Sequence, residues 1–537
     1  MDRNWSKTFS FLTAAVLAQL PLLPTRANPA AFRASAAQSP SFQTANGYPI
    51  ARQVFVGDRE ILQPQDIRPL PGGLDSTPVF NSNSPEAIRQ SGILLSTFPP
   101  QGKLSPNAHL GHALQGRFDV FAHHIAKTDK PDTTPTLYNG ILIYNPNPTQ
   151  PVIVNVLKAG SFLGNPEAPY IGLPPFLENP FGRVFSGPGG RLTDALLRNN
   201  RLPSWPSRID LLPKQSQMLM NLPIPVPRPG LSRLMSSPLM SRNRLPASLR
   251  RRSSLNLMPI NAASSSNTRS TMLQLYSSGP VYMAYLAMYA PITPSRTERV
   301  PQKSDWENLV INGKLAEPRD RPPSVTDNGT DKFFYGRVSG ISRGSQWQAK
   351  VTDTPRSKRL TIPVAGEAFS YGLSTLPRGT FGTGQVQSAP MLVRYPDTAW
   401  LSHGNYGVHY QVSLPLYNPT DAPKQVAVVV QTPIKRDVWG NGLQFLRALP
   451  DQVFFRGTIR VRYQDDDNIP QLRYYHLNQR QGQQGEPLAL ITLGKKENRT
   501  ISLDYMYPPD ATPPQVLTIQ TLAATSSNQR SAYGIQP

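Results

Sequence analysis

Hydrophobic and polar residues alternate over short stretches along most of the chain. In TIRVRYQ, residues 458–464, three apolar side chains fall on one face of an extended strand and two arginines on the other. The run VAVVV at 426–430 repeats this alternation with valines. Such runs, separated by stretches rich in Pro and Gly, predict a mainly β protein with long loops.

Signals for helices are few. The segment SPEAIRQ at 84–90 offers Ser84 as an N-cap and Pro85 at the first helical position. The segment TDALLRNN begins at Thr193 and has the composition of a short helix. We therefore expect a few short helices, including these two, in an otherwise β chain.

Two distant segments repeat the same order of features. ILIYNPN at 141–147 and LPLYNPT at 414–420 each join a strand to an Asn-Pro turn, and a second proline and a valine-rich strand follow in both. Asn bonds its own backbone and Pro fixes the next φ, so this chemistry predicts a hairpin turn at each place.

The repetition extends beyond the turns. GRFDVFAHH lies upstream of the first and GNYGVHYQV upstream of the second, while LLPKQSQMLMNLPIP and TLGKKENRTISLDYMYP lie downstream, each followed by a further strand. Four elements in the same order predict two related β-sandwich domains of the Ig-like kind. The alternative is that β proteins often reuse Asn-Pro turns.

These features divide the chain into segments. We predict a signal peptide at 1–27, a flexible linker at 28–60, a first β-sandwich domain at 61–300 with a basic insertion at 227–270, a linker at 301–332, a second β-sandwich domain at 333–523 and a flexible tail at 524–537.

The N-terminus has the composition of a secretory signal peptide. Arg3 and Lys7 precede the apolar run FSFLTAAVLAQLPLL at 9–23, and small residues follow, with cleavage expected after Ala27 or Ala36. No later stretch approaches the roughly 20 apolar residues that span a bilayer. We therefore expect an exported protein of the periplasm, outer envelope or cell surface, with no transmembrane segment after signal cleavage.

Charge and cysteine content narrow the function. The 537 residues include no cysteine, which excludes disulfides, Fe–S clusters and a cysteine nucleophile. The formal net charge is +22, so the surface attracts anions. In an envelope these are anionic polysaccharides or lipids, and export makes nucleic acid an unexpected partner.

Positive charge is densest around the basic insertion. No acidic residue occurs from Leu211 to Thr297, whereas Lys214 and nine arginines do. The Pro and Ser content of the insertion at 227–270 is typical of a disordered loop. Such a loop is compatible with a basic arm that neutralises anionic sites. The candidate anion-binding residues are Arg242, Arg244, Arg250, Arg251 and Arg252.

A cluster of histidines suggests an alternative function. His109, His112, His123 and His124 fall within sixteen residues. Imidazole is the commonest metal ligand, so the cluster suggests a metal-dependent periplasmic hydrolase as the alternative function. On a strand, however, the adjacent pair points to opposite faces, which favours structural roles. No cofactor is predicted.

Two other motifs have simpler explanations. GISRG at 340–344 matches the nucleophile elbow G-x-S-x-G, but the strand-like SQWQAKVT follows it where that motif needs a helix. DDDN at 465–468 has the residue types of a calcium loop and equally those of a hairpin turn. We expect a hairpin turn at both.

Several longer strings together carry a family resemblance. PVFNSNSPE, GRFDVFAHH, AFSYGLSTLPRGTFGTGQVQSAPMLVRYPDTA, HGNYGV and PPDATPPQVLT resemble a family of exported cyanobacterial proteins catalogued as domain of unknown function 3370, from about residue 60 to about residue 523. The resemblance implies a photosynthetic bacterial envelope and carries over no activity, cofactor or catalytic residue.

The sequence thus predicts a secreted cell-envelope protein with a non-enzymatic binding or structural role. Its expected partner is an anionic envelope polysaccharide or lipid, bound through basic residues. A scaffold that binds protein partners through a sheet edge is a further alternative.

Overall fold

The structure is a computed structural model that describes residues 53–56, 59–226, 266–324, 333–438 and 440–523. Strands make up 47% of the described residues and helices 6%, which confirms the predicted mainly β class. The predicted signal peptide, the five candidate arginines of the basic insertion and the tail at 524–537 lie outside the described residues.

The described helices are the 3-10 helix η1 Pro106–Ala108 and the α-helices α1 Gly187–Leu197 and α3 Lys303–Asn312. The strands are β1 Val54–Val56, β2 Glu60–Pro64, β3 Asp66–Arg68, β4 Gly73–Leu74, β5 Pro78–Ser82, β6 Ala87–Ile88, β7 Gly92–Ser96, β8 Leu114–Lys127, β9 Leu137–Tyr144, β10 Val152–Leu163, β11 Phe176–Glu178, β12 Arg208–Leu211, β13 Ser216–Ile224, β14 Ser266–Tyr289, β15 Ser339–Arg343, β16 Gln346–Lys350, β17 Leu360–Thr361, β18 Ala368–Leu373, β19 Ala389–Arg394, β20 Leu401–Ser402, β21 His409–Tyr417, β22 Lys424–Gln431, β23 Gly442–Leu446, β24 Val453–Gln464, β25 Pro470–Arg480, β26 Pro487–Leu493, β27 Asn498–Met506 and β28 Gln515–Thr521.

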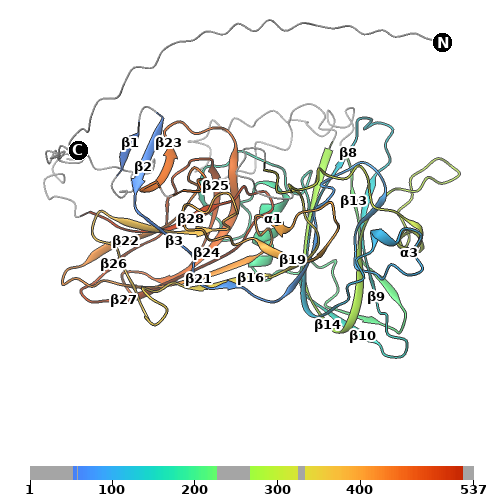
Figure 1. The fold of residues 1–537 in the computed structure, drawn as a ribbon, viewed down its shortest axis with the longest axis horizontal. Helices are drawn as coiled ribbons and strands as arrows, with labels where there is room; N and C mark the ends of the chain where they lie inside the picture. Colours follow the sequence, from blue (N-terminus) through green and yellow to red (C-terminus); the bar gives the residue numbers. More distant parts are fainter. Residues whose placement is uncertain (1–52, 57–58, 227–265, 325–332, 439, 524–537) are drawn as a thin grey trace, which may run out of the picture. The chain divides into compact units, whose positions relative to one another are not determined.

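One order of five strands occurs twice. It reads β12-β10-β14-β8-β5 within the largest sheet and β26-β22-β28-β18-β3 in a second sheet. Figure 1 labels β8, β10 and β14 of the first run and β3, β22, β26 and β28 of the second. In both, the first four strands are antiparallel neighbours. The fifth strand joins in parallel in both. The strand β8 therefore occupies the place of β18, whereas GNYGVHYQV, the predicted counterpart of β8, continues into β21.

We call the predicted first and second domains, residues 61–300 and 333–523, the first and the second half. Each five-strand run packs against further strands of the half that supplies most of its own strands. In the first half β9 pairs with β13 and with the C-terminal part of β14. In the second half β21 pairs with β27. Alternating apolar side chains of these strands meet those of the five-strand run, as Ile141 meets Val154 and Leu414 meets Val428 in their clusters. Each half therefore has its own hydrophobic core.

The halves also share sheets. Strands β2, β3 and β4, from residues 60–74, pair with β23, β18 and β16 of the second half. In return, β15 pairs with β5 of the first half, and β19 and β20 continue that sheet. The predicted domain boundaries remain a prediction. The strands β5 and β15, on either side of the predicted linker at 301–332, hydrogen-bond to each other.

The two Asn-Pro turns are not hairpins, so that prediction was wrong. Strands β9 and β10 pair with other strands and not with each other, and the same holds for β21 and β22. In each turn a buried asparagine amide donates to three carbonyl oxygens: Asn145 to Gln150, Leu211 and Leu212, and Asn418 to Ala422, Leu493 and Gly494, at 2.8–3.1 Å. Because the side chain satisfies these groups, the turn does not need a hairpin ladder.

A lysine completes each Asn-Pro turn in the same way. Lys214 and Lys496 both have positive φ, 56° and 52°. Their ammonium groups donate to the carbonyls of Pro146 and Pro419 at 2.6 and 2.5 Å. The two turns thus share their hydrogen bonds although their sequences differ in most other positions.

One predicted helix is present and the other is not. Helix α1 includes Thr193–Leu197 of the second predicted segment, although it begins upstream, at Gly187. In SPEAIRQ, Ala87 and Ile88 instead form β6, parallel to β8. Ile88 is completely buried there. This burial and pairing outweigh a weak local preference for helix.

We expect Asn145→Ala and Asn418→Ala to destabilise the protein by similar amounts, about 2–3 kcal/mol each, because each change leaves buried carbonyls without a donor. Urea denaturation followed by circular dichroism measures the effect. Asn312→Ala, an exposed position at the end of α3, is the control and should change stability by less than about 0.5 kcal/mol. An unchanged midpoint for either turn variant would contradict the role given to these amides.

Candidate functional site

The four clustered histidines do not converge. His109 Nδ1 lies 2.8 Å from Ser96 Oγ, and His123 Nδ1 lies 2.8 Å from Ser270 Oγ. His124 bonds Ser82 Oγ and the Pro85 carbonyl, each at 2.9 Å. The adjacent pair thus faces different partners, as strand geometry predicts. Within the described ranges no three His, Asp or Glu side chains gather as a metal site requires.

DDDN is the turn of a hairpin, as predicted, but GISRG is not a hairpin turn, so that prediction was wrong: its residues 340–343 lie within β15, and β15 does not pair with β16. Ser342 is only 2% exposed and lies within β15, so it cannot act as an exposed nucleophile. The turn after it leads from β15 in one sheet to β16 in another. Asp465 accepts the backbone N–H groups of Asp467 and Ile469 and so closes the hairpin between β24 and β25.

A hollow of about 290 Å³ lies where both flanks of the basic insertion enter the structure. Val226 ends the described chain on one side, and Ser266, on the other, pairs with Lys127. The lining of this arm-root hollow includes Lys127, Thr128, Thr134, Thr136, Val226 and Tyr289.

Positive charge at the arm-root hollow is only partly compensated. An adjoining hollow shares Lys127 and adds Arg89, Asp129 and Lys130. Arg89 pairs with Asp129 at 2.9 Å. No ion pair within the described part of the chain joins Lys127 or Lys130, and both are exposed. Lys127 in the arm-root hollow and Lys130 in the adjoining hollow are therefore two exposed cations without an ion-pair partner in this part of the structure.

A second pocket, of about 230 Å³, lies between the two halves. We call it the seam pocket. It is lined by Asn81 and Asn83, at the end of β5, and by residues of the second half that include Tyr335, Arg337, His403, Tyr406 and Lys435. The two asparagines are buried, at 3% and 7% exposure, whereas Lys435 is exposed. The asparagines therefore lie at the floor and the lysine at the rim.

Polar groups of the seam pocket lack partners within the described ranges. Asn81 Oδ1, Asn83 Oδ1 and His403 Nδ1 accept or donate no hydrogen bond there. Burial lowers the pKa of His403 to about 4, so its imidazole is neutral at neutral pH. Since buried polar groups in proteins are nearly always paired, this concentration of unpaired groups points to a binding site.

Sequence reasoning missed the seam pocket because its residues come from distant segments. Two of these segments, PVFNSNSPE and HGNYGV, were noticed only as strings of a family resemblance. The one local signal is the pair of asparagines themselves: Asn81 lies in β5, and Asn83 follows directly after the strand ends at Ser82.

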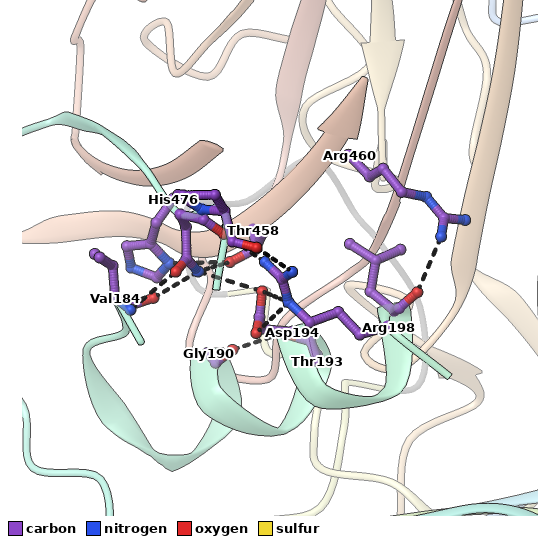
Figure 2. Close-up of polar contacts among 11 residues, drawn as sticks. Val184, Gly190, Thr193, Asp194, Arg198, Thr458, Arg460 and His476 are labelled. Carbon is purple, nitrogen blue, oxygen red and sulfur yellow. Dashed lines mark hydrogen bonds and ion pairs between the residues drawn. The ribbon is translucent and has the colours of Figure 1, made fainter. Parts of the chain in front are cut away.

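A third polar cluster joins helix α1 to the second half (Figure 2). Arg198 donates to Asp194 at 3.0 Å, and Asn179 donates to both Asp194 and Thr458 at 3.3 Å. Thr458 Oγ1 lies 3.4 Å from His476 Nδ1. Burial raises the pKa of Asp194, although its hydrogen bonds to Arg198 and Thr458 oppose this shift.

The residue types of this cluster match a Thr-His-Asp triad, but their burial excludes catalysis by them. Thr458, His476 and Asp194 are 2%, 0% and 4% exposed, so no substrate reaches them. Burial also lowers the pKa of His476, to about 4. The cluster holds α1 against β24 and β25.

Beside this cluster, Asp504 contacts three basic side chains of the second half. It accepts Arg460 Nε and His409 Nε2, both at 2.9 Å, and lies 3.4 Å from Arg462. Arg460 also donates to the Leu197 carbonyl at the end of α1 (Figure 2). Burial alone would raise the pKa of Asp504, but the hydrogen bonds from His409 and Arg460 outweigh it and hold the pKa below its ordinary value.

We expect Asp504→Asn to destabilise the protein by about 3 kcal/mol at pH 7, because Arg460 loses a buried counter-charge. A carboxylate with a depressed folded-state pKa stabilises the fold above its unfolded pKa, so the deficit of the variant should be constant from pH 5 to pH 7, each value about a unit or more above the ordinary pKa. It should shrink as the pH falls below the ordinary value of 3.8. Urea denaturation of both proteins across pH measures this, and a deficit that is equally large at pH 3 and pH 7 would refute it.

Comparisons with known proteins give a family and no activity. No curated protein matches the chain. Among solved structures, a pumpkin seed globulin is 9% identical, with 81% of this chain and 85% of that chain covered and a TM-score of 0.09. Lac15 from a marine microbial metagenome is also 9% identical, with 82% and 100% covered and a TM-score of 0.08. Scores this low carry no argument about the fold. Residues 65–521 match the family described as "Protein of unknown function (DUF3370)", and the chain belongs to this family.

Proposed function

We propose that this protein is a non-enzymatic binding protein of the cell envelope that attaches to anionic envelope polysaccharide or lipid through basic side chains. The observation that carries the proposal is the arm-root hollow. Lys127, which lines this hollow, pairs with Ser266 at one flank of the basic insertion, and Lys130 lines the adjoining hollow. A polymer bound by the arginines of the insertion would meet further positive charge at these two lysines.

The charge of the whole chain supports an anionic partner. The net charge of +22 over 537 residues raises the local concentration of anions around the protein. In an exported protein of a cyanobacterial envelope, the abundant anions are acidic polysaccharides and lipid phosphates. Protein partners that add to a sheet edge are compatible with the same location.

The part of the chain that the structure describes contains no helix long and apolar enough to cross a membrane. For the mechanism proposed here, attachment is electrostatic and falls as salt rises, because mobile ions screen exposed charges within about 10 Å at 0.1 M salt.

We further infer that the scaffold consists of two Ig-like β-sandwich units related by internal duplication. The repeated five-strand order supports this inference. The matching bonds of Asn145 and Asn418, and of Lys214 and Lys496, support it independently. On this view the arm-root hollow belongs to the first unit alone, since the second has no counterpart of the insertion.

We expect replacement of Arg242, Arg244, Arg250, Arg251 and Arg252 by Ser to weaken attachment more than about tenfold, since each cation near an anionic surface contributes about 1 kcal/mol. Co-sedimentation with isolated outer membrane, peptidoglycan and exopolysaccharide across a salt series measures the attachment and identifies the ligand class.

The matched control removes the same charge elsewhere. It replaces five exposed cations of the second half by Ser: Arg343, Lys350, Arg356, Lys358 and Arg473. The control should keep most of the binding. Equal losses in both variants would mean that net charge alone is responsible, and no salt-sensitive binding by the unmodified protein would overturn the proposal.

A further inference from the structure

The seam pocket points to a specific ligand unit. We propose that it binds one acidic sugar unit, a hydroxyl-bearing ring with a carboxylate, of the anionic polymer to which the protein attaches. The inference rests on the proposed function, because the polymer would supply this unit. It adds a specific site to the electrostatic attachment made by the basic insertion.

The charges of the seam pocket select an anion. Its lining contains two cationic side chains, Arg337 and Lys435, and no acidic side chain. Arg337 is already paired with Glu86, so Lys435 is the cation available at the rim. Desolvation lowers the pKa of Lys435, although nearby Asp437 opposes this shift, and a bound anion would likewise favour the charged ammonium group. The ammonium group of a cationic ligand would find no carboxylate in this lining.

The unpaired polar atoms select hydroxyl groups as well. Asn81 Oδ1 and Asn83 Oδ1 are acceptors without a donor within the described ranges, and His403 Nδ1, which donates or accepts according to its tautomer, is unpaired there as well. A hydroxyl group donates and accepts at once, so a polyhydroxylated ligand can pair with both kinds of atom. A fully ionised inorganic anion such as sulfate only accepts, and it would leave the two carbonyls unpaired.

The walls of the pocket suit one ring. Tyr335 and Tyr406 line it with aromatic surface. Both rings are fixed in place, because Tyr335 Oη bonds the backbone of Arg378 at 3.1 and 3.2 Å and Tyr406 Oη donates to the Ala511 carbonyl at 3.0 Å. The volume of about 230 Å³ lies below the range of roughly 300–1,000 Å³ for drug-sized ligands. It therefore has room for a single sugar ring, held by preorganised groups.

Isothermal titration calorimetry of the mature full-length protein tests the proposal, with sodium galacturonate as probe and glucose and sodium sulfate as comparators. We expect saturable one-to-one binding of galacturonate, at least about tenfold tighter than that of glucose or sulfate. Lys435→Gln should weaken galacturonate binding about tenfold and leave glucose binding almost unchanged, because it removes only the charge. Asn83→Leu should weaken both sugars.

Lys350→Gln, an exposed change outside the pocket, is the matched control and should leave all affinities unchanged. Circular dichroism melting confirms that each variant is folded. The proposal is overturned if the unmodified protein binds no galacturonate, if sulfate binds as well as galacturonate, or if Lys435→Gln behaves like the control.

The two proposals fail separately. If the protein co-sediments with an envelope polymer but binds no galacturonate, the seam-pocket proposal is wrong and the attachment proposal stands. If galacturonate binds and Lys435→Gln weakens it, but no envelope fraction is retained, the pocket stands as a sugar site and the attachment proposal is wrong.

Discussion

The backbone hydrogen bonds of residues 60–82 join the two halves of the protein. Strands β2, β3 and β4 extend sheets of the second half, and β5 extends the five-strand run of the first half, all within one short stretch. A chain without cysteine has no disulfide to make this connection. The strand pairings of this stretch therefore connect the sheets of the two halves. Because Asn81 and Asn83 lie at its end, they also place the floor of the seam pocket.

Much of the local structure could be predicted from the sequence, because strands leave a strong pattern. TIRVRYQ and VAVVV lie in β24 and β22, and DDDN forms the turn of a hairpin. The pairing of strands could not be predicted in the same way. Nothing near an Asn-Pro turn indicates whether its strands pair with each other, since that depends on carbonyls such as Leu211, 66 residues away from Asn145. The same applies to β6, where Ile88 is buried by a distant strand.

The candidate sites also differ in how far the sequence alone could reveal them. Composition was sufficient to single out the basic insertion, because charge is visible without a fold. The seam pocket was not visible, because Asn83, Tyr335 and His403 belong to three segments that only the fold brings together. The histidines near residue 120 show the opposite case, in which residues close together in the sequence do not form a common site. They are close along the chain, yet His123 and His124 bond different strands because successive residues of β8 face opposite ways.

The prolines that follow Asn145 and Asn418 have a chemical consequence. Asparagine side chains deamidate when the backbone nitrogen of the next residue attacks the amide carbon, and that nitrogen must first lose its hydrogen. Pro146 and Pro419 carry no hydrogen on nitrogen, so this route is closed at both turns. Deamidation would replace the donor by an acidic oxygen that faces three carbonyls. The Asn-Pro pair thus protects the two buried amides from chemical ageing, which suits a protein whose turns must last as long as the molecule.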